Sequence, residues 1–246
     1  WNITPDDSAG VPLSLTAPGR FLLHILELAQ PQLTPEGLLI LLKHPLAHSG
    51  SDRGQHLLNT RELEIYLRQK GPAFLSRQSL LDWAKGKDLY LMWVNWLISC
   101  VFSHWPTGSQ PMESWLDHHC TIAKRLSDGP SEMEGKLWDQ APGRDTKKIM
   151  DELLLHGTAA GDVDLLDYRS ILHGILGTNE TRDQNITHSN ILIWGTLEAR
   201  VQSADLVILA GLNDGAWPEP PKPDPWLNRN LRLQAGLLLP ERKIGL

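Results

Sequence analysis

The stretch that decides the fold is Ile191-Leu-Ile-Trp-Gly-Thr-Leu-Glu-Ala-Arg200, followed closely by Ala204-Asp-Leu-Val-Ile-Leu-Ala-Gly-Leu-Asn-Asp-Gly-Ala-Trp-Pro218. Each part holds an apolar run of strand length, and a short charged turn joins the two runs. The second run leads into a loop of Gly, Asn, Asp, Trp and Pro. Ligands of open α/β proteins bind just past the carboxyl ends of the strands, so this loop is a candidate binding site.

A helical pattern dominates the chain before this stretch. Apolar residues at helical spacing begin near Phe21, and Thr34 is an expected N-cap because Pro35 follows it at the first helical position. Further helices are predicted over 53–70, 79–85, 89–102, 112–126, 135–138, 146–155, 165–176 and 226–235. The expected organisation is an irregular segment at 1–19, a helical subdomain at 20–177 and a small α/β portion at 178–246.

Composition narrows the class of protein. With 246 residues, of which 41% are hydrophobic, the chain can bury a sizeable core. Its formal net charge of -6 argues against a free-standing basic nucleic-acid binder, whose affinity comes from clustered Lys and Arg. A DNA contact inside a larger assembly stays open, because a partner can supply the positive field.

The thiols and the apolar runs bear on compartment. Cys100 and Cys120 form no repeated C-x-x-C pattern, which argues against a zinc or iron–sulfur site in this chain. Two thiols suit a reducing compartment, so we expect a cytoplasmic protein. No apolar run approaches the roughly 18 residues that span a bilayer, so no membrane partner is expected.

Motifs at both ends of the chain together resemble the AddB subunit of bacterial AddAB helicase–nucleases, in the form found in alphaproteobacteria. The C-terminal motifs are Trp194-Gly-Thr-Leu-Glu-Ala-Arg200, the run from Asp205 to Pro218, Asp224-Pro-Trp-Leu-Asn-Arg229 and Pro240-Glu-Arg-Lys-Ile-Gly-Leu246. The N-terminal motifs are Asp6-Asp-Ser-Ala-Gly-Val-Pro-Leu13, Thr16-Ala-Pro-Gly-Arg-Phe21 and Leu42-Lys-His-Pro-Leu46. The resemblance covers both ends well and the helical middle loosely.

The resemblance implies a fold and a set of partners. AddB-like proteins follow a superfamily 1 helicase plan in which the second RecA-like domain carries a helical insertion. The chain is then expected to be an internal segment of a longer protein, of class α/β. It comprises a predominantly helical insertion subdomain and a small parallel-strand RecA-like remnant. The implied partners are an AddA-like helicase–nuclease subunit and DNA.

The resemblance also implies site residues. In active relatives the region matching Trp194 to Glu198 reads Ala-Lys-Gly-Leu-Glu, where the Glu lies near the nucleotide ribose and its neighbours touch single-stranded DNA. Glu198 is thus a candidate nucleotide contact, and Thr196 and Arg200 are candidate DNA contacts. Gly195 stands where the Lys is expected, and Thr196 where the Gly is expected. This departure argues against motor action at the site and fits a scaffold.

The loop after the second run offers further DNA-binding candidates. Asn213 and Asp214 carry short polar groups, and Trp217 has a ring that can stack on a base. The alternative for these residues is a structural turn whose Trp packs in the core. The alternative for Glu198 and Arg200 is a strand-connecting turn with solvated charges.

No complete active site is expected in this chain, and no catalytic or metal-binding residue is predicted. The phosphate-binding pattern G-x-x-x-x-G-K-[ST] does not occur. ATP, Mg²⁺ and an iron–sulfur cluster are therefore expected only in other parts of the parent. Whether the chain itself belongs to an enzyme stays open.

Three other groups of residues have simpler interpretations. Core packing is expected for Trp93, Trp96, Trp105, Trp115 and Trp138, which lie in apolar helical settings. Metal binding is not expected for His44 with His48 or for His118-His119-Cys120, because no third ligand is evident or the side chains diverge. A DNA path or a solvated surface is possible for Arg20, Arg53, Arg61, Arg68, Arg77, Lys85 and Lys87.

The expected function follows from the resemblance. The parent resects DNA double-strand breaks before homologous recombination, and this part serves as a scaffold that guides DNA and contacts the partner. Two alternatives are a non-catalytic helical adaptor that binds only protein, and a carbohydrate-active enzyme suggested by tryptophan content and acidity. The enzyme alternative requires a pair of close carboxylates in an aromatic cleft.

Overall fold

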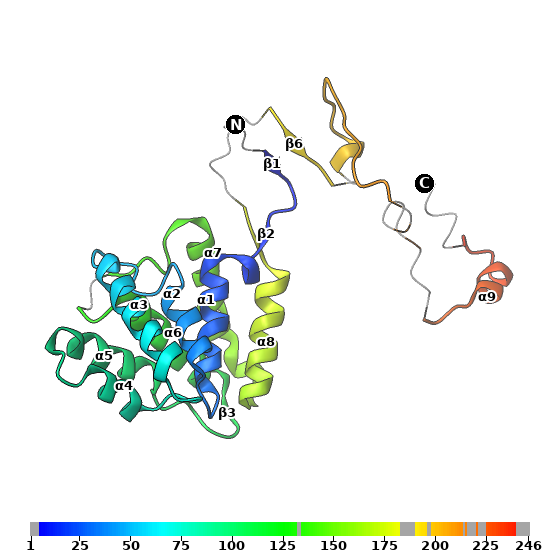
Figure 1. Cartoon of the computed structure of the whole chain (residues 1–246). Coiled ribbons are helices and arrows are strands. Elements are labelled where there is room, and N and C mark those ends of the chain that lie inside the picture. Colours follow the sequence, from blue (N-terminus) through cyan, green and yellow to red (C-terminus); the bar gives the residue numbers. More distant parts are fainter. Residues whose placement is uncertain are drawn as a thin grey trace. The chain divides into compact units, whose positions relative to one another are not determined.

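The computed structural model describes residues 5–131, 134–182, 190–195, 198–213, 215, 220 and 225–239, without the side chains of residues 88 and 89. The chain divides into two units, Trp1–Ile193 and Trp194–Leu246. The first unit contains the helical body, and the described residues of the second contain irregular segments, a 3-10 helix and the short helix α9 (Arg229–Gln234) (Figure 1). Each unit is described by itself.

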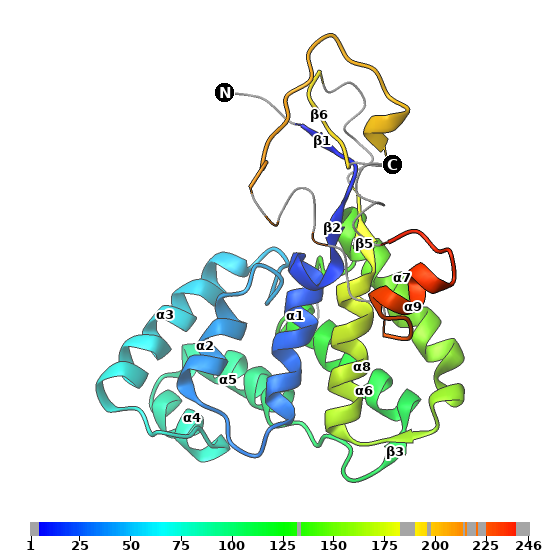
Figure 2. The same cartoon turned by 90° about the vertical axis from the view of Figure 1, so that its right-hand side faces the viewer.

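Helix α1 (Ala17–Leu26) lies at the centre of the helical body. It begins at Ala17 because the Thr16 side chain accepts a hydrogen bond from the Gly19 amide at 3.4 Å, which satisfies one of the free N–H groups at the helix start. Gly19 has to be a glycine, because a Cβ atom there would lie 1.9 Å from the carbonyl oxygen of Leu13. The helix starts three residues before the expected boundary and contacts α2, α6, α7 and α8 (Figure 2).

Side-chain caps begin three of the remaining helices of the body, α2, α4 and α8. The expected N-cap at Thr34 is confirmed, since its hydroxyl accepts from the Gly37 amide at 3.1 Å. Asp164 caps in the same way through the Asp167 amide at 2.9 Å. The helices of the body after α1 are α2 (Pro35–Lys43), α3 (Arg53–Lys70), α4 (Arg77–Ala84), α5 (Asp88–Val101), α6 (Met112–Asp128), α7 (Gln140–His156) and α8 (Leu165–Thr178). The helix expected over 135–138 is not present, and those residues form a turn.

One hydrophobic core joins these helices. Its largest fully buried side chains include Trp115, Tyr168 and Phe21. The expected core role of the tryptophans is confirmed: Trp93, Trp96, Trp105 and Trp115 are buried, and Trp138 is partly buried against the same core. Burying rings of this size supplies a large part of the apolar contact that holds a helical body together.

Strands are few and short among the described residues. β1 (Asp6–Asp7) pairs in parallel with β6 (Leu192–Ile193). The antiparallel pairs are β2 (Val11–Pro12) with β5 (Glu180–Thr181), and β3 (Gln110–Pro111) with β4 (Asp162–Val163). The fold is therefore mostly helical with a few small sheets, and β1 with β6 is the one parallel pair in the part of the chain that the structure describes.

The expected pair of long strands is not present in the described part of the chain. Only Leu192–Ile193 of the described first run is a strand, and residues 204–213 of the second run form no strand, with a bend at 205–206. Strand backbones need neighbouring strands to satisfy their N–H and C=O groups, and no described segment pairs with the second run. Its apolar side chains consequently lie in solvent, with Leu206 exposed to 76% and Ile208 to 79%.

Candidate functional site

Glu198 lies in a short 3-10 helix, η4 (Glu198–Arg200), of the second unit. Its carboxylate accepts a hydrogen bond from the Gly195 amide at 3.1 Å, while the Ala199 amide donates to the Gly195 carbonyl at 3.0 Å. The side chain thus closes its own turn, in the way that acidic residues commonly cap a helix start. This local role accords with the interpretation as a connecting turn, and the nucleotide contact stays a prediction.

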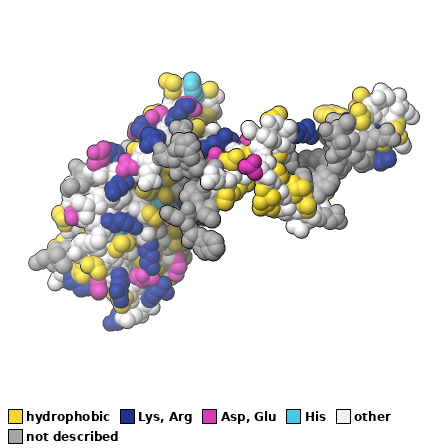
Figure 3. Space-filling model, turned by 90° about the horizontal axis from the view of Figure 1, so that it is seen from above, with side chains coloured by type: hydrophobic (Ala, Val, Ile, Leu, Met, Phe, Trp, Pro, Cys, Tyr) yellow, Lys and Arg dark blue, Asp and Glu magenta, His cyan; other side chains and the backbone are white. Residues whose placement is uncertain are grey.

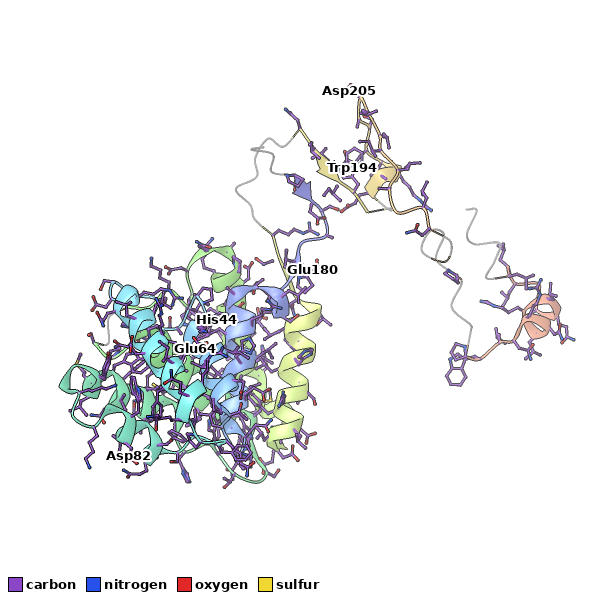
Figure 4. The ribbon with its side chains drawn as sticks, in the orientation of Figure 1. His44, Glu64, Asp82, Glu180, Trp194 and Asp205 are labelled. Atoms are coloured by element: carbon purple, nitrogen blue, oxygen red, sulfur yellow. The ribbon has the colours of Figure 1, made fainter. Side chains whose placement is uncertain are left out.

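Arg200 lies in the same turn, and its side chain is exposed. Arg200 and Glu198 therefore lie close together in space, within one turn. Figure 4 labels Trp194 and Asp205, which flank this turn on either side. Thr196, the remaining candidate of this group, lies outside the described residues.

Asn213 lies in an exposed extended segment after the second apolar run. Its amide donates to the carbonyl of Gly211 at 2.7 Å, and Gly211 has φ +73°, so the backbone turns sharply at that glycine. Gly215 has φ +76° and makes a second such bend. The candidates Asp214 and Trp217 lie outside the described residues. The described loop therefore has the turn chemistry that the sequence predicts.

The chemistry available at these positions is that of recognition. An exposed guanidinium, an exposed amide and bent backbone can donate hydrogen bonds to phosphate oxygens. Across the described ranges, no group of three or more His, Cys, Asp or Glu is placed to hold a metal ion. Arg200 and Asn213 are exposed and can offer such donors, and a binding role for them and for Glu198 stays a prediction.

Several basic residues that either line a DNA path or form a solvated surface make contacts within the helical body. Arg53 donates to the carbonyl of Ala47, and Arg77 donates to the carbonyl of Phe102. Arg68 pairs with Glu64 at 2.7 Å. On the face drawn in Figure 3, Lys and Arg are dispersed among apolar and acidic side chains over the helical body. Arg53, Arg68 and Arg77 therefore have partners within the helical body.

Several histidines of the helical body pack their rings against other rings. His44 stacks on Phe21 with ring centroids 4.9 Å apart, and His48 lies 5.3 Å from His56 in an edge arrangement (Figure 4 labels His44). Burial lowers the pKa of His44 and of His56 to about 4, so both rings are neutral at pH 7. These contacts give His44 and His48 a packing role.

His119 is fully buried between α1 and α8. Its Nε2 atom lies 3.0 Å from the Leu22 carbonyl, and its Nδ1 atom lies 2.8 Å from the Tyr168 hydroxyl. Burial lowers the pKa of His119 to about 4. This ring joins three helices by hydrogen bonds, which the sequence pattern alone did not indicate.

Sequence reasoning also missed a pocket on the helical body between α5 and α6. The Arg125 pocket, as we name it, has a volume of about 500 Å³ and is lined by Asn95, Trp96 and Ser99 of α5 and by Lys124, Arg125 and Asp128 of α6. The only signal in the sequence is that Asn95 and Ser99 share one helix face at i, i+4 spacing. Nothing in the sequence tells which face of α6 meets them.

Comparison with known proteins gave no match: no family model, no curated protein and no solved structure is similar to the chain. The resemblance to AddB-like subunits thus depends on the quoted motifs alone. A search of the described residues found no helix with both the length and the apolar character needed to cross a membrane.

Proposed function

We propose that the chain is a segment of an AddB-like subunit of an ATP-dependent helicase–nuclease that resects DNA double-strand breaks for homologous recombination. The segment serves as a scaffold, which guides a DNA strand and contacts an AddA-like partner in the cytoplasm. ATP, Mg²⁺ and an iron–sulfur cluster belong to other parts of that complex in this proposal. The AddB-like motifs at both ends of the chain support it.

The observation that carries the proposal is the exposed apolar run at 205–212. Leu206, Val207, Ile208 and Leu209 are each more than 60% exposed. Continuous apolar runs of this length are typical of strands that are buried on both faces of a parallel sheet. Left in water, each such side chain forgoes about 1.5–3 kcal/mol of burial free energy.

The parallel pair β1–β6 supports the same interpretation. An isolated parallel pair of two residues on each strand has little stability of its own, because parallel sheets depend on further strands and on covered faces. β6 directly precedes the segment that carries η4 and the exposed run. A larger RecA-like sheet in the parent, to which both runs belong, accounts for the pair and for the exposure together.

The test is a binding titration of the 246-residue chain with a fluorescent 3′-tailed DNA duplex. We expect saturable binding at about 20 mM salt, with an association constant that falls steeply as salt rises, because phosphate contacts release counterions. The variant Arg200→Gln weakens binding, whereas Arg144→Gln on α7 of the helical body does not. Absence of binding at about 20 mM salt contradicts DNA guidance and leaves the protein-binding adaptor as the better account.

A carbohydrate-active enzyme is a weaker alternative. Its main support was the tryptophan content, and the structure places Trp93, Trp96, Trp105 and Trp115 in the core. Sugar-binding tryptophans expose a ring face to a cleft, whereas Trp93, Trp105 and Trp115 are buried and Trp96, which lines the Arg125 pocket, is only 9% exposed. We therefore do not propose this function.

A further inference from the structure

The Arg125 pocket holds an arginine that is fixed in place before any ligand arrives. A guanidinium nitrogen of Arg125 donates to the Ser99 hydroxyl at 2.7 Å, and that hydroxyl donates to the Trp96 carbonyl at 2.7 Å. The Trp96 indole N–H in turn donates to the Arg125 carbonyl at 3.0 Å. This closed set of hydrogen bonds ties both ends of Arg125 to α5, so its side chain loses little freedom on binding a ligand.

The charge of Arg125 is not neutralised by the described residues. The ion pairs of the described part of the chain give it no carboxylate partner. Its contact with Ser99 uses one of the five N–H donors of a guanidinium. The remaining donors form the fork that matches a phosphate or a carboxylate.

The one acidic side chain in the pocket is itself held by donors. Asp128 pairs with Lys124, and its other oxygen accepts from the Gly135 amide at 2.9 Å. The carboxylate is also nearly buried, with the residue 9% exposed. Lys124, Arg125 and Asp128 together leave one net positive charge, and Asn95 adds an exposed amide donor at the same wall.

We propose that the Arg125 pocket binds a phosphate group, either that of a free nucleotide or a phosphodiester of a single DNA strand. The Arg125 fork and the Asn95 amide contact the phosphate oxygens, and Lys124 strengthens the local positive field. Met92, which is 64% exposed at the rim, offers apolar contact to the rest of the ligand. The DNA source rests on the proposed function, whereas the nucleotide source is independent of it.

The experiment is calorimetric titration of the 246-residue chain with inorganic phosphate in a phosphate-free buffer of low ionic strength. We expect saturable binding, and a loss of affinity of about tenfold or more in Arg125→Gln, because a charge-assisted, forked contact is removed. The matched control is Arg61→Gln, an exposed arginine on α3 outside the pocket, which changes affinity by less than about twofold.

A second variant keeps the test decisive if Arg125→Gln fails to fold. Asn95 is exposed, so Asn95→Asp leaves the core intact and adds a negative charge to the wall, which weakens phosphate binding. Titrations with thymidine monophosphate and with an oligothymidylate lacking terminal phosphates separate the two sources. The proposal is overturned if no probe binds saturably, or if the folded pocket variants bind as the unmodified chain does.

The outcomes also separate this site from the proposed function. If inorganic phosphate, thymidine monophosphate and the oligothymidylate all fail to bind while the 3′-tailed duplex still binds, the pocket proposal alone is wrong. If phosphate binds through Arg125 while the duplex does not bind, the pocket proposal stands and DNA guidance is wrong.

Discussion

At the scale of single residues, hydrogen bonds fix the protonation of the buried histidines. The Trp93 indole donates to Nδ1 of His56 at 3.0 Å, so that nitrogen carries no proton. Nε2 of His56 lies 2.8 Å from the Leu42 carbonyl, which only accepts, so the ring proton is on Nε2. A second proton would break the bond to Trp93 and place a charge in the core.

Acid therefore destabilises the fold through His56 and His119, whose pKa burial lowers to about 4. Above pH 6.5 both rings are neutral in the folded and the unfolded chain. Between pH 6.5 and about 4 only the unfolded chain takes up these protons, so the free energy of unfolding falls by about 1.4 kcal/mol for each pH unit and each histidine. Urea unfolding at pH 7, 6 and 5 measures this slope.

A substitution at one of these histidines tests that prediction. His56→Gln reduces the slope by the contribution of one proton, whatever its effect on stability at pH 7. A free energy of unfolding that does not vary between pH 6.5 and 5 would contradict the neutral, buried assignment.

Two helical glycines make a matched pair for a packing prediction. A Cβ at Gly19 of α1 would meet the Leu13 carbonyl oxygen at 1.9 Å, whereas a Cβ at Gly174 of α8 would meet nothing within 4 Å. Gly19→Ala should destabilise the chain by about 2 kcal/mol or more, because backbone must move. Gly174→Ala should stabilise it by about 0.5–1 kcal/mol, as alanine is the better helix former. The urea midpoints of unfolding of the two variants measure these changes. Equal shifts of the two midpoints would contradict the close approach at Gly19.

At the scale of elements, the sequence predicts helices whose signals lie in nearby residues, and it does not predict contacts between residues distant in sequence. The bounds of α3 and the cap of α2 at Thr34 follow from nearby residues, and both are confirmed. The strand expected in the apolar run after Ala204 is not formed by the described residues, because a strand depends on neighbours that can lie anywhere in a polypeptide. The Arg125 pocket could not be predicted for the same reason, since the crossing of α5 and α6 creates it.

The exposed run at 205–212 has a consequence for association. Unpaired backbone and apolar side chains in one segment favour pairing between copies of the chain. We expect light scattering to show concentration-dependent self-association, and Ile208→Asp to reduce it. Leu155→Asp on α7, a residue exposed to 74%, is the matched control and has a smaller effect. Equal effects of both substitutions would show that the run is not the cause.

At the scale of the whole chain, the two units differ in how they are held. A continuous core joins α1 to α8 in the first unit, whereas the described residues 201–213 of the second are exposed throughout. The change of periodicity near 177 predicts a helical part followed by an α/β part, and that boundary stays a prediction. By its contacts the chain divides between Ile193 and Trp194, since β5 and β6 pair with strands near the start of the chain.

The difference predicts where a protease cuts first. Brief trypsin treatment should cleave after Arg200, which is exposed in a short turn, before it cleaves after Arg61 inside α3. Mass spectrometry of the products should show a fragment that retains the helical body. Arg200→Gln removes that first cut, and early cleavage within α3 would contradict the prediction.

The parallel pairing of β1 with β6 also has a mechanical consequence. The chain passes through β1, forms the whole helical body and returns through β6 beside its starting point. Tension applied through the polypeptide on either side loads these two strands in shear, since it pulls the start of one against the end of the other. The helices lie in the chain between the two strands, so they carry no force while the strands stay paired. The pair therefore separates before the helical core is stretched.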